Sequence, residues 1–309
     1  MSNTAFIFPG QGSQYAGMGK ELAANFRVAA DVFAEADEAL SFSLSRLCHE
    51  GPEEELRLTA NTQPAILAVS VAALRVVMTE TGLSPTFLAG HSLGEYSALV
   101  ASGALALADA VRTVRSRGSF MQEAVPVGVG AMAAILTVEA DILAEICAEA
   151  AQGEVVSPAN FNSPGQIVIA GHATAVNRAM AIAKERGFRK AMLLPVSAPF
   201  HCSLMKPAAD RLGEVLEGIT LAAVAPPVVT NVEALANADI NRVRELLVAQ
   251  VCSPVRWAQS VEEMIRLGVE SFIEIGPGKV LSGLVKRISK APVTFNVEDL
   301  AGLKALPNG

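Results

Sequence analysis

Residues 87–96 read Phe87-Leu88-Ala89-Gly90-His91-Ser92-Leu93-Gly94-Glu95-Tyr96. An apolar run ends in a Gly-X-Ser-X-Gly pentapeptide, and a helix-forming sequence follows directly. This order is typical of a nucleophile elbow, in which a strand turns sharply into a helix and exposes a serine hydroxyl at the bend. Side chains at the two glycine positions would crowd such a turn, and the helix start offers N–H groups that can hold negative charge near Ser92. The plainer alternative is a turn whose serine only caps the helix.

The segments around this turn alternate between strand and helix patterns. We expect a strand at 4–8, helices at about 18–40 and 64–79, and, after the elbow, helices at about 93–102 and 107–123. Further along, the pattern predicts helices near 203–216, 241–251 and 257–267, strands at 227–230 and 271–275, and a last helix from Lys279. Such alternation predicts a largely parallel sheet covered by helices.

The helical pattern ends at 125–130, where valine alternates with proline and glycine. Between 131 and 194 the patterns follow the order β-α-β-β-α-β, which is the ferredoxin-like split unit. We therefore expect an α/β fold: an α/β-hydrolase-like catalytic domain at 1–125 and 197–309, with a ferredoxin-like small subdomain inserted at 126–196.

Composition narrows the class of protein. The chain has 309 residues, and a formal net charge of -7 argues against general nucleic-acid binding. The cysteines Cys48, Cys147, Cys202 and Cys252 are scattered without metal-ligand spacing, as expected of reduced thiols in the cytoplasm. We see no secretory signal and no apolar run of the roughly 18 residues that a membrane span needs. We expect a cytoplasmic enzyme without a metal or bound cofactor.

A serine nucleophile needs a general base, and the chain offers four histidines. His91 adjoins Ser92 and should point to the opposite face of the strand, His49 lies in a charged surface stretch, and His172 starts a helix of the small unit. His201 lies where the small unit rejoins the main domain, beside an expected cleft. Elimination therefore favours His201 as the base, although a lone loop histidine can also be purely structural.

Six ordered motifs extend this pattern over nearly the whole chain. They are Phe-Pro-Gly-Gln-Gly-Ser-Gln at 8–14, Asn-Thr-Gln-Pro-Ala at 61–65, Gly-His-Ser-Leu-Gly-Glu-Tyr at 90–96, Arg-Gly-Ser-Phe-Met-Gln at 117–122, Ser-Ala-Pro-Phe-His at 197–201 and Glu-Ile-Gly-Pro-Gly-Lys at 274–279. In these motifs the chain resembles the malonyl-CoA:acyl-carrier-protein transacylases of bacterial fatty-acid synthesis.

The resemblance implies a role for each residue that matches a family motif. Ser92 would accept the acyl group and His201 would act as its general base. The main-chain N–H groups of Gln11 and Leu93 would form the oxyanion hole. The main-chain carbonyl of Gln250 would orient the histidine, where serine hydrolases use a carboxylate.

The resemblance also selects one arginine for the acyl carboxylate. Arg112, Arg115 and Arg117 lie close together, and spacing alone does not show which points inward. The family motif selects Arg117, whose planar guanidinium can bind the free carboxylate of a malonyl group through two hydrogen bonds. The remaining residues that would line the site are Gln63, His91, Met121, Asn160 and Phe200, and Phe200 would crowd the methyl branch of methylmalonyl.

The implied reaction is a ping-pong transfer from malonyl-CoA, through a malonyl-Ser92 ester, to the phosphopantetheine thiol of acyl carrier protein. The carrier is acidic, so a basic docking patch is expected despite the net charge. The candidates are Lys184, Arg186, Arg189 and Lys190 on the small subdomain, or Lys286 and Arg287 in the last helix. A solvated face is the plain reading of either run, and we expect a monomer.

Three other functions share parts of this pattern. A malonyltransferase of polyketide synthesis or malonate decarboxylation would keep every catalytic residue and differ in its carrier. A serine hydrolase would share the elbow but would have no use for Arg117. A non-catalytic docking subunit would not need Ser92, His201 and Arg117 together.

Overall fold

The computed structural model describes residues 3–196 and 198–307, so Ser197 of the predicted motif at 197–201 lies outside the described residues. The main sheet has six strands in the order β10-β9-β1-β2-β7-β8. They are β1 (Thr4–Phe8), β2 (Phe87–Gly90), β7 (Val228–Val229), β8 (Ala236–Asn237), β9 (Ser271–Ile275) and β10 (Val293–Val297). Neighbouring strands run parallel except β7 and β8.

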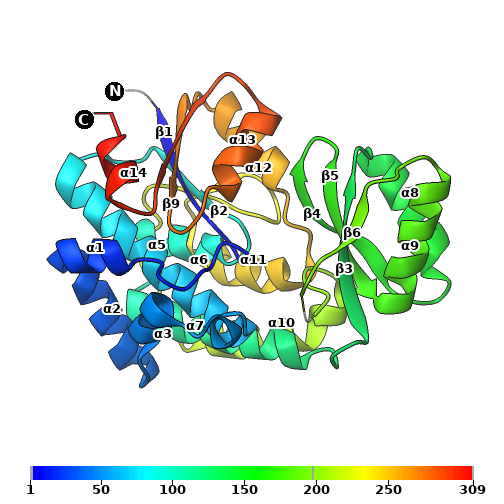
Figure 1. The fold of residues 1–309 in the computed structure, drawn as a ribbon, viewed down its shortest axis with the longest axis horizontal. Helices are drawn as coiled ribbons and strands as arrows, with labels where there is room; N and C mark the ends of the chain where they lie inside the picture. Colours follow the sequence, from blue (N-terminus) through cyan, green and yellow to red (C-terminus); the bar gives the residue numbers. More distant parts are fainter. Residues whose placement is uncertain (1–2, 197, 308–309) are drawn as a thin grey trace.

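Helices cover both faces of this sheet (Figure 1). Successive side chains of a strand point to opposite faces, so Phe6 and Phe8 join one core while Ala5 and Ile7 join the other. The first core also contains side chains from α2 (Arg27–Leu40), α5 (Thr59–Thr81), α6 (Gly94–Ala101), α7 (Leu107–Glu123), α10 (Lys206–Glu217) and α11 (Ile240–Cys252). The second contains side chains from α12 (Trp257–Arg266) and α13 (Val280–Ile288).

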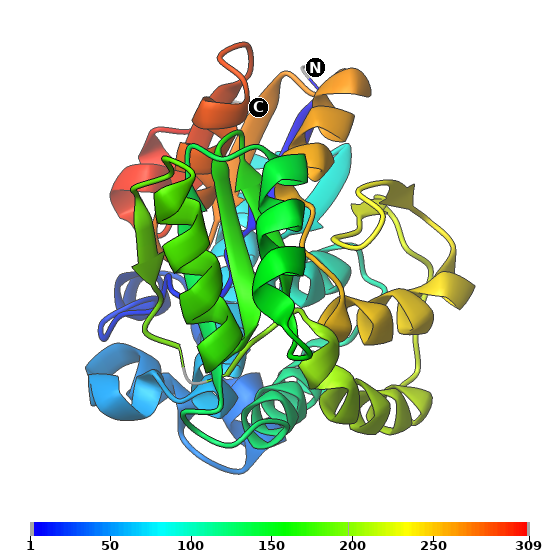
Figure 2. The ribbon, with the colours of Figure 1, turned by 90° about the vertical axis from the view of Figure 1, so that its right-hand side faces the viewer.

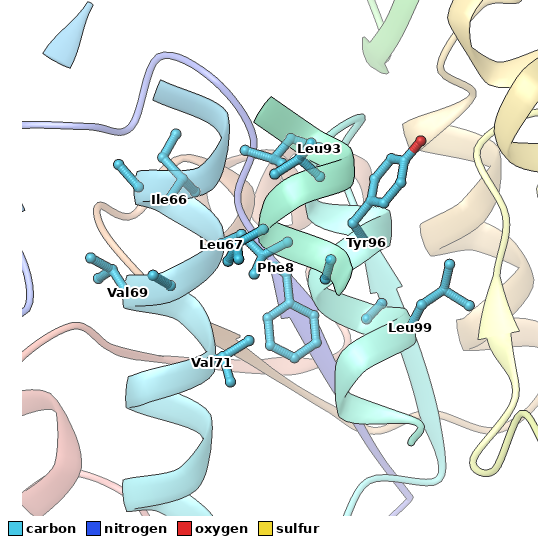
Figure 3. Close-up of a cluster of buried hydrophobic side chains, with 14 of the residues drawn as sticks. Phe8, Ile66, Leu67, Val69, Val71, Leu93, Tyr96 and Leu99 are labelled. Atoms are coloured by element: carbon cyan, nitrogen blue, oxygen red, sulfur yellow. The ribbon is translucent and has the colours of Figure 1, made fainter. Parts of the chain in front are cut away.

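Helix α5 forms the centre of the first core. Its side chains Leu67 and Val71 face Phe8, and α6 closes the cluster with Leu93 and Tyr96 (Figure 3). The sequence analysis expected no apolar run of membrane-spanning length, yet α5 is long and apolar enough by those criteria. Because 83% of its most apolar window is buried inside the protein, α5 is a core helix of the fold.

A second, antiparallel sheet lies beside the first, with strand order β4-β5-β3-β6. Its elements are β3 (Gly130–Leu136), α8 (Ala140–Ala151), β4 (Val156–Ser163), β5 (Gln166–His172), α9 (Ala173–Glu185) and β6 (Ala191–Leu193). The two helices pack on one face and bury a separate apolar cluster (Figure 2). This β-α-β-β-α-β arrangement has ferredoxin-like topology. The predicted fold class is confirmed.

Backbone hydrogen bonds tie the four-stranded unit to the main body of the protein. Val255 pairs with Asn160 of β4 in a parallel bridge. Phe161 donates its N–H to the carbonyl of Val255 over 2.9 Å, and Val255 donates to the carbonyl of Ala159 over 2.9 Å. The two sheets are therefore joined by main-chain contacts as well as by the connecting chain.

Several elements differ from the sequence prediction. The single helix expected at 18–40 is two helices, α1 (Lys20–Asn25) and α2, because Phe26 between them is extended. The segment expected as one helix from 203 begins with the short 3-10 helix η1 (Ser203–Met205). The prediction lacked α3 (Leu44–Glu50), α4 (Glu53–Leu56), β8, β10 and α14 (Leu300–Lys304). Most of these are short, so their periodicity is weak.

The elbow after β2 depends on its two glycines. Ser92 has a φ of 52°, in the left-handed region that side chains rarely adopt. A Cβ at Gly90 would collide with the backbone of Gly94, and a Cβ at Gly94 would collide with the carbonyl of Phe8 in β1. The turn is thus pressed against the neighbouring strand with no space for a methyl group.

We predict that Gly94→Ala destabilises the protein, because the β1 backbone cannot move aside without breaking the sheet. The expected loss is about 1–3 kcal/mol, the usual cost of overpacking. Gly283→Ala is the matched control, since this α13 glycine has nothing within 4 Å of the added Cβ. It should leave stability unchanged or raise it by about 1 kcal/mol. Urea unfolding measures both, and equal effects would contradict the packing argument.

Candidate active site

Ser92 and His201 come together at the carboxyl edge of the main sheet. The Ser92 Oγ lies 2.8 Å from His201 Nε2, and His201 Nδ1 lies 2.9 Å from the main-chain carbonyl oxygen of Gln250. A carbonyl only accepts hydrogen bonds, so Nδ1 carries the proton and donates it. The lone pair of Nε2 therefore faces the serine hydroxyl, which is the tautomer that a general base needs.

Burial keeps the histidine neutral. Only 4% of His201 is exposed. The pKa of His201 is lowered to about 3. Desolvation is the largest cause and the charge of Arg117 the second, while the hydrogen bond to Gln250 opposes the shift. The ring is therefore uncharged at neutral pH and free to accept a proton from Ser92.

Arg117 is the buried cation beside the serine. Its Nη2 donates to Ser92 Oγ over 3.1 Å and to Gln250 Oε1 over 2.9 Å, while Nη1 donates to Gln63 Oε1 over 2.7 Å. Its Nε has no hydrogen-bond partner among the described residues. Burial lowers the pKa of Arg117, the direction expected for a cation that only neutral acceptors contact.

The other two arginines of α7 point away from the serine. Arg112 donates to Asp109 and to the carbonyl of Ala39, and Arg115 donates to Asn61. The structure thus separates the three candidates, which sequence spacing alone left open.

Ser92 lines a cavity of about 120 Å³. The residues named from the sequence that line it are Gln11, Gln63, His91, Ser92, Leu93, Arg117, Met121, Asn160, Phe200 and His201. Gln250 lies behind this lining, reached through Arg117 and His201. His91 is turned away from Ser92 and has its Nε2 2.9 Å from Asn162 Oδ1, so it fits the sequence argument against a role as base.

The N-terminus of α6 adjoins the serine. Leu93 is the N-cap residue of this helix, and N–H groups at a helix start have no intrahelical acceptors. Gln11 follows β1 and lines the same cavity. Gly10 lies against the His91 carbonyl so closely that no Cβ would fit, which lets the Gln11 loop approach the elbow.

The two remaining histidines lie outside the cavity. His49, in α3, packs edge-on against Phe33 with ring centroids 4.6 Å apart. His172 accepts a hydrogen bond from the Val155 N–H at the start of α9. Among residues 3–196 and 198–307, no three His, Cys, Asp or Glu side chains are grouped so as to hold a metal ion.

Asn231 is a buried residue beside the site that the sequence analysis missed. It follows β7, and its Oδ1 accepts from the Ser92 N–H over 2.6 Å while its Nδ2 donates to the Gly90 carbonyl over 2.7 Å. Asn231 thus fastens both sides of the elbow. A polar residue directly after a buried parallel strand was the signal that could have found it.

Glu95 is another missed residue. Its Oε2 accepts from the Asn231 N–H over 2.9 Å and from Gln250 Nε2 over 2.8 Å, and the residue is 2% exposed. Desolvation raises the pKa of Glu95 to about 7, although these two hydrogen bonds and the charge of Arg117 oppose it. An acidic residue in an otherwise apolar helix directly after the elbow was the available signal.

A partly exposed serine next to a buried histidine, a helix start and a buried arginine is an arrangement suited to acyl transfer. The acyl transferase domain model matches residues 5–305, and the chain belongs to this family.

The chain is 52% identical over 305 residues to the malonyl CoA-acyl carrier protein transacylase of Salmonella typhimurium, with 99% of each chain covered. A crystal structure of an acyl carrier protein S-malonyltransferase from Vibrio cholerae superimposes with a TM-score of 0.96 at 51% identity, covering 99% of this chain and 100% of that one. A chain from the structure of a type II polyketide synthase acyl-carrier protein in complex with its malonyl-transacylase superimposes with a TM-score of 0.96. The two chains are 49% identical, and 98% of each is covered.

The buried carboxyl group of Glu95 should make stability depend on pH. Its raised pKa means that the folded protein holds a proton that the unfolded chain releases, so this group favours folding below its ordinary pKa near 4.5 and loses that effect as pH rises through about 7. The Glu95→Gln variant has no carboxyl group at this position, so it has no proton to lose there between these pH values. We therefore predict that the Tm of Glu95→Gln rises relative to wild type between pH 5 and pH 8.

Thermal unfolding at the two pH values measures this difference. Glu217→Gln, at an exposed position of α10, controls for the loss of one carboxylate. A Tm difference between Glu95→Gln and wild type that is the same at pH 5 and pH 8 would contradict the assignment.

Proposed function

We propose that this protein transfers a malonyl group from malonyl-CoA to the phosphopantetheine thiol of acyl carrier protein. One observation carries the choice of acyl group: the buried guanidinium of Arg117 contacts Ser92 Oγ at 3.1 Å, and its hydrogen-bond acceptors among the described residues are neutral. A malonyl group esterified to Ser92 would bring a carboxylate to this cation. The names of the relatives agree with the proposal.

In the first half-reaction, Ser92 Oγ attacks the thioester carbonyl and His201 Nε2 takes its proton. The resulting oxyanion is held by the main-chain N–H groups of Leu93 and Gln11, a type of contact worth several kcal/mol in acyl transfer. The tetrahedral intermediate then collapses, coenzyme A leaves as the C–S bond breaks, and His201 returns the proton to the sulfur. The product is a malonyl-Ser92 ester.

The second half-reaction runs the same steps in reverse with a new thiol. The carrier's thiol gives its proton to His201 and attacks the ester carbonyl, and Ser92 leaves with that proton. One thioester is exchanged for another, so substrates and products have similar free energies and the transfer is reversible. The neutral Gln250 carbonyl, which stabilises an imidazolium less than a carboxylate would, suits such a reversible transfer.

The ester must be kept from water. Apolar side chains line the cavity, among them Met121, Met132, Leu194 and Phe200. A larger groove of about 560 Å³ adjoins it, and Gln11 and Val196 line both. We assign this groove to the pantetheine arm of the acyl donor. Phe200 limits the space beside the acyl group, which favours malonyl over methylmalonyl.

Further assignments are part of the same proposal. Gln63, His91 and Asn160 line the acyl site.

The domain division is also part of the proposal. Residues 126–196 form a small subdomain inserted into a catalytic domain made of 1–125 and 197–309. The enzyme is a cytoplasmic monomer. A polyketide carrier in place of a fatty-acid carrier is the alternative, because one relative is bound to such a carrier.

For the docking patch we favour α13 over the small subdomain. Arg186 already pairs with Glu145 and Glu149, which neutralise its charge. Arg287 donates instead to the neutral side chain of Gln166, so its charge remains available to an acidic partner, and Lys286 beside it is exposed. The remaining candidates on the small subdomain are Lys184, Arg189 and Lys190, all exposed.

Charge reversal separates the two patches. Lys286→Glu with Arg287→Glu should raise the KM for the carrier about tenfold and leave loading from malonyl-CoA unchanged, because charges on the rim of an interface act on association. Lys184→Glu with Lys190→Glu is the matched control. Steady-state transfer to carrier protein measures both, and a larger effect from the control pair would move the docking site to the small subdomain.

Intact-protein mass spectrometry tests the proposed reaction directly. Mixing the enzyme with malonyl-CoA should add one malonyl group, which Ser92→Ala abolishes and which moves to carrier protein on its addition. A hydrolase would instead release malonate and accumulate no adduct. Folded wild-type protein that forms no adduct would refute the proposal.

Arg117→Ala serves as the second arm of the same assay. Malonyl loading should fall by about 10²-fold or more, because an ion-paired hydrogen bond is lost in a desolvated site. Acetyl loading should survive or improve, because an acetyl group has no carboxylate. Equal losses for the two acyl groups would remove Arg117 from the carboxylate site.

A further inference from the structure

The side-chain amide of Gln250 has a single possible orientation. Its Nε2 donates to Glu95 Oε2 over 2.8 Å and to the Ser92 main-chain carbonyl over 3.0 Å. Its Oε1 accepts from Arg117 Nη2 over 2.9 Å. Acceptors lie on one side of the amide and a donor on the other, so a flipped amide would oppose like groups on both sides.

Glu95 supplies the shorter of the two hydrogen bonds that Gln250 Nε2 donates, and together with the Ser92 carbonyl it fixes this orientation. Its Oε2 also accepts a hydrogen bond from the Asn231 N–H, and Asn231 Oδ1 accepts one from the Ser92 N–H. The carboxyl oxygen therefore connects the elbow to Gln250, and Gln250 connects it to Arg117. Glu95 does not line the catalytic cavity, so it does not contact the acyl group.

We propose that Glu95 is a positioning residue for acyl selectivity: its carboxyl oxygen holds the Gln250 side chain, which in turn holds Arg117 Nη2 beside the serine. The proposal rests on the malonyl transfer proposed above. Glu95 acts on the arginine through the Gln250 side chain, whereas His201 is held by the Gln250 main chain within α11. Loss of Glu95 should therefore affect malonyl loading more than acetyl loading.

Glu274 provides a comparison within the same chain. This carboxylate is also fully buried, and it accepts from the N–H groups of Leu281 and Ser282 at the start of α13. Within the described part of the chain its carboxylate hydrogen bonds go to that helix start, and it is not among the residues that line the catalytic cavity. It matches Glu95 in chemistry and burial but lacks the connection to the site.

The experiment compares single-turnover loading from malonyl-CoA and acetyl-CoA. Glu95→Met keeps the side-chain volume and removes the acceptor, and it should lower kcat/KM for malonyl loading by about 10-fold to 100-fold, as expected when a buried hydrogen bond is lost. Acetyl loading should change less than about threefold. Glu95→Gln keeps an acceptor oxygen, which its two donors select, and should retain the wild-type malonyl-to-acetyl ratio.

Glu274→Met is the matched control and should lower Tm without changing the ratio. In a Gln250→Leu background, which keeps the main-chain carbonyl, Glu95→Met should cause no further change in the ratio. If Glu95→Met does not fold, Gln250→Leu alone breaks the same connection and should show the selective malonyl loss.

Equal losses of malonyl and acetyl loading in Glu95→Met or Gln250→Leu would overturn the positioning role. A loss of selectivity in Glu95→Gln as large as in Glu95→Met would also overturn it, because the charge and not the acceptor would then be responsible. Wild-type protein that forms no malonyl-serine refutes the proposed function instead. The two failures are thereby distinguished.

Discussion

The buried charge of Arg117 is the constraint on which the site depends. A cation removed from water must be met by hydrogen-bond acceptors, and here they are the amides of Gln63 and Gln250 and the hydroxyl of Ser92. Those contacts direct the guanidinium at Ser92 Oγ. The same charge helps to keep His201 neutral, so in the proposed reaction one residue would affect both substrate choice and the protonation state of the base.

The fold places these groups by bringing distant segments to one sheet edge. Ser92 follows β2, Asn231 follows β7 and Gln11 follows β1, and parallel strands end on the same side. Helices supply the rest, with Arg117 on α7 and Gln250 on α11. Arg117 and Gln250 are buried on core helices, and Asn231 is buried where the chain leaves β7, whereas Gln11 lies in an exposed turn after β1.

Sequence reasoning reached the elbow, the ferredoxin-like unit and the His201 candidate because each has a local pattern: paired glycines, alternating periods, a small set of histidines. The choice of Arg117 over Arg112 and Arg115 needed the family motif, since helix spacing does not show where the core lies. Glu95 and Asn231 were missed because their partners are more than 130 positions away in the chain. Short elements such as β10 were missed because their stability comes from tertiary pairing.

The main-chain bridge between Val255 and β4 has a consequence for the site in which the ester forms. Its hydrogen bonds join one wall of the cleft to the segment that follows α11, so a swing of the four-stranded unit would have to break main-chain contacts. In the proposed reaction, the malonyl ester would therefore form in a site whose two sides are joined through the main chain as well as by the connecting chain.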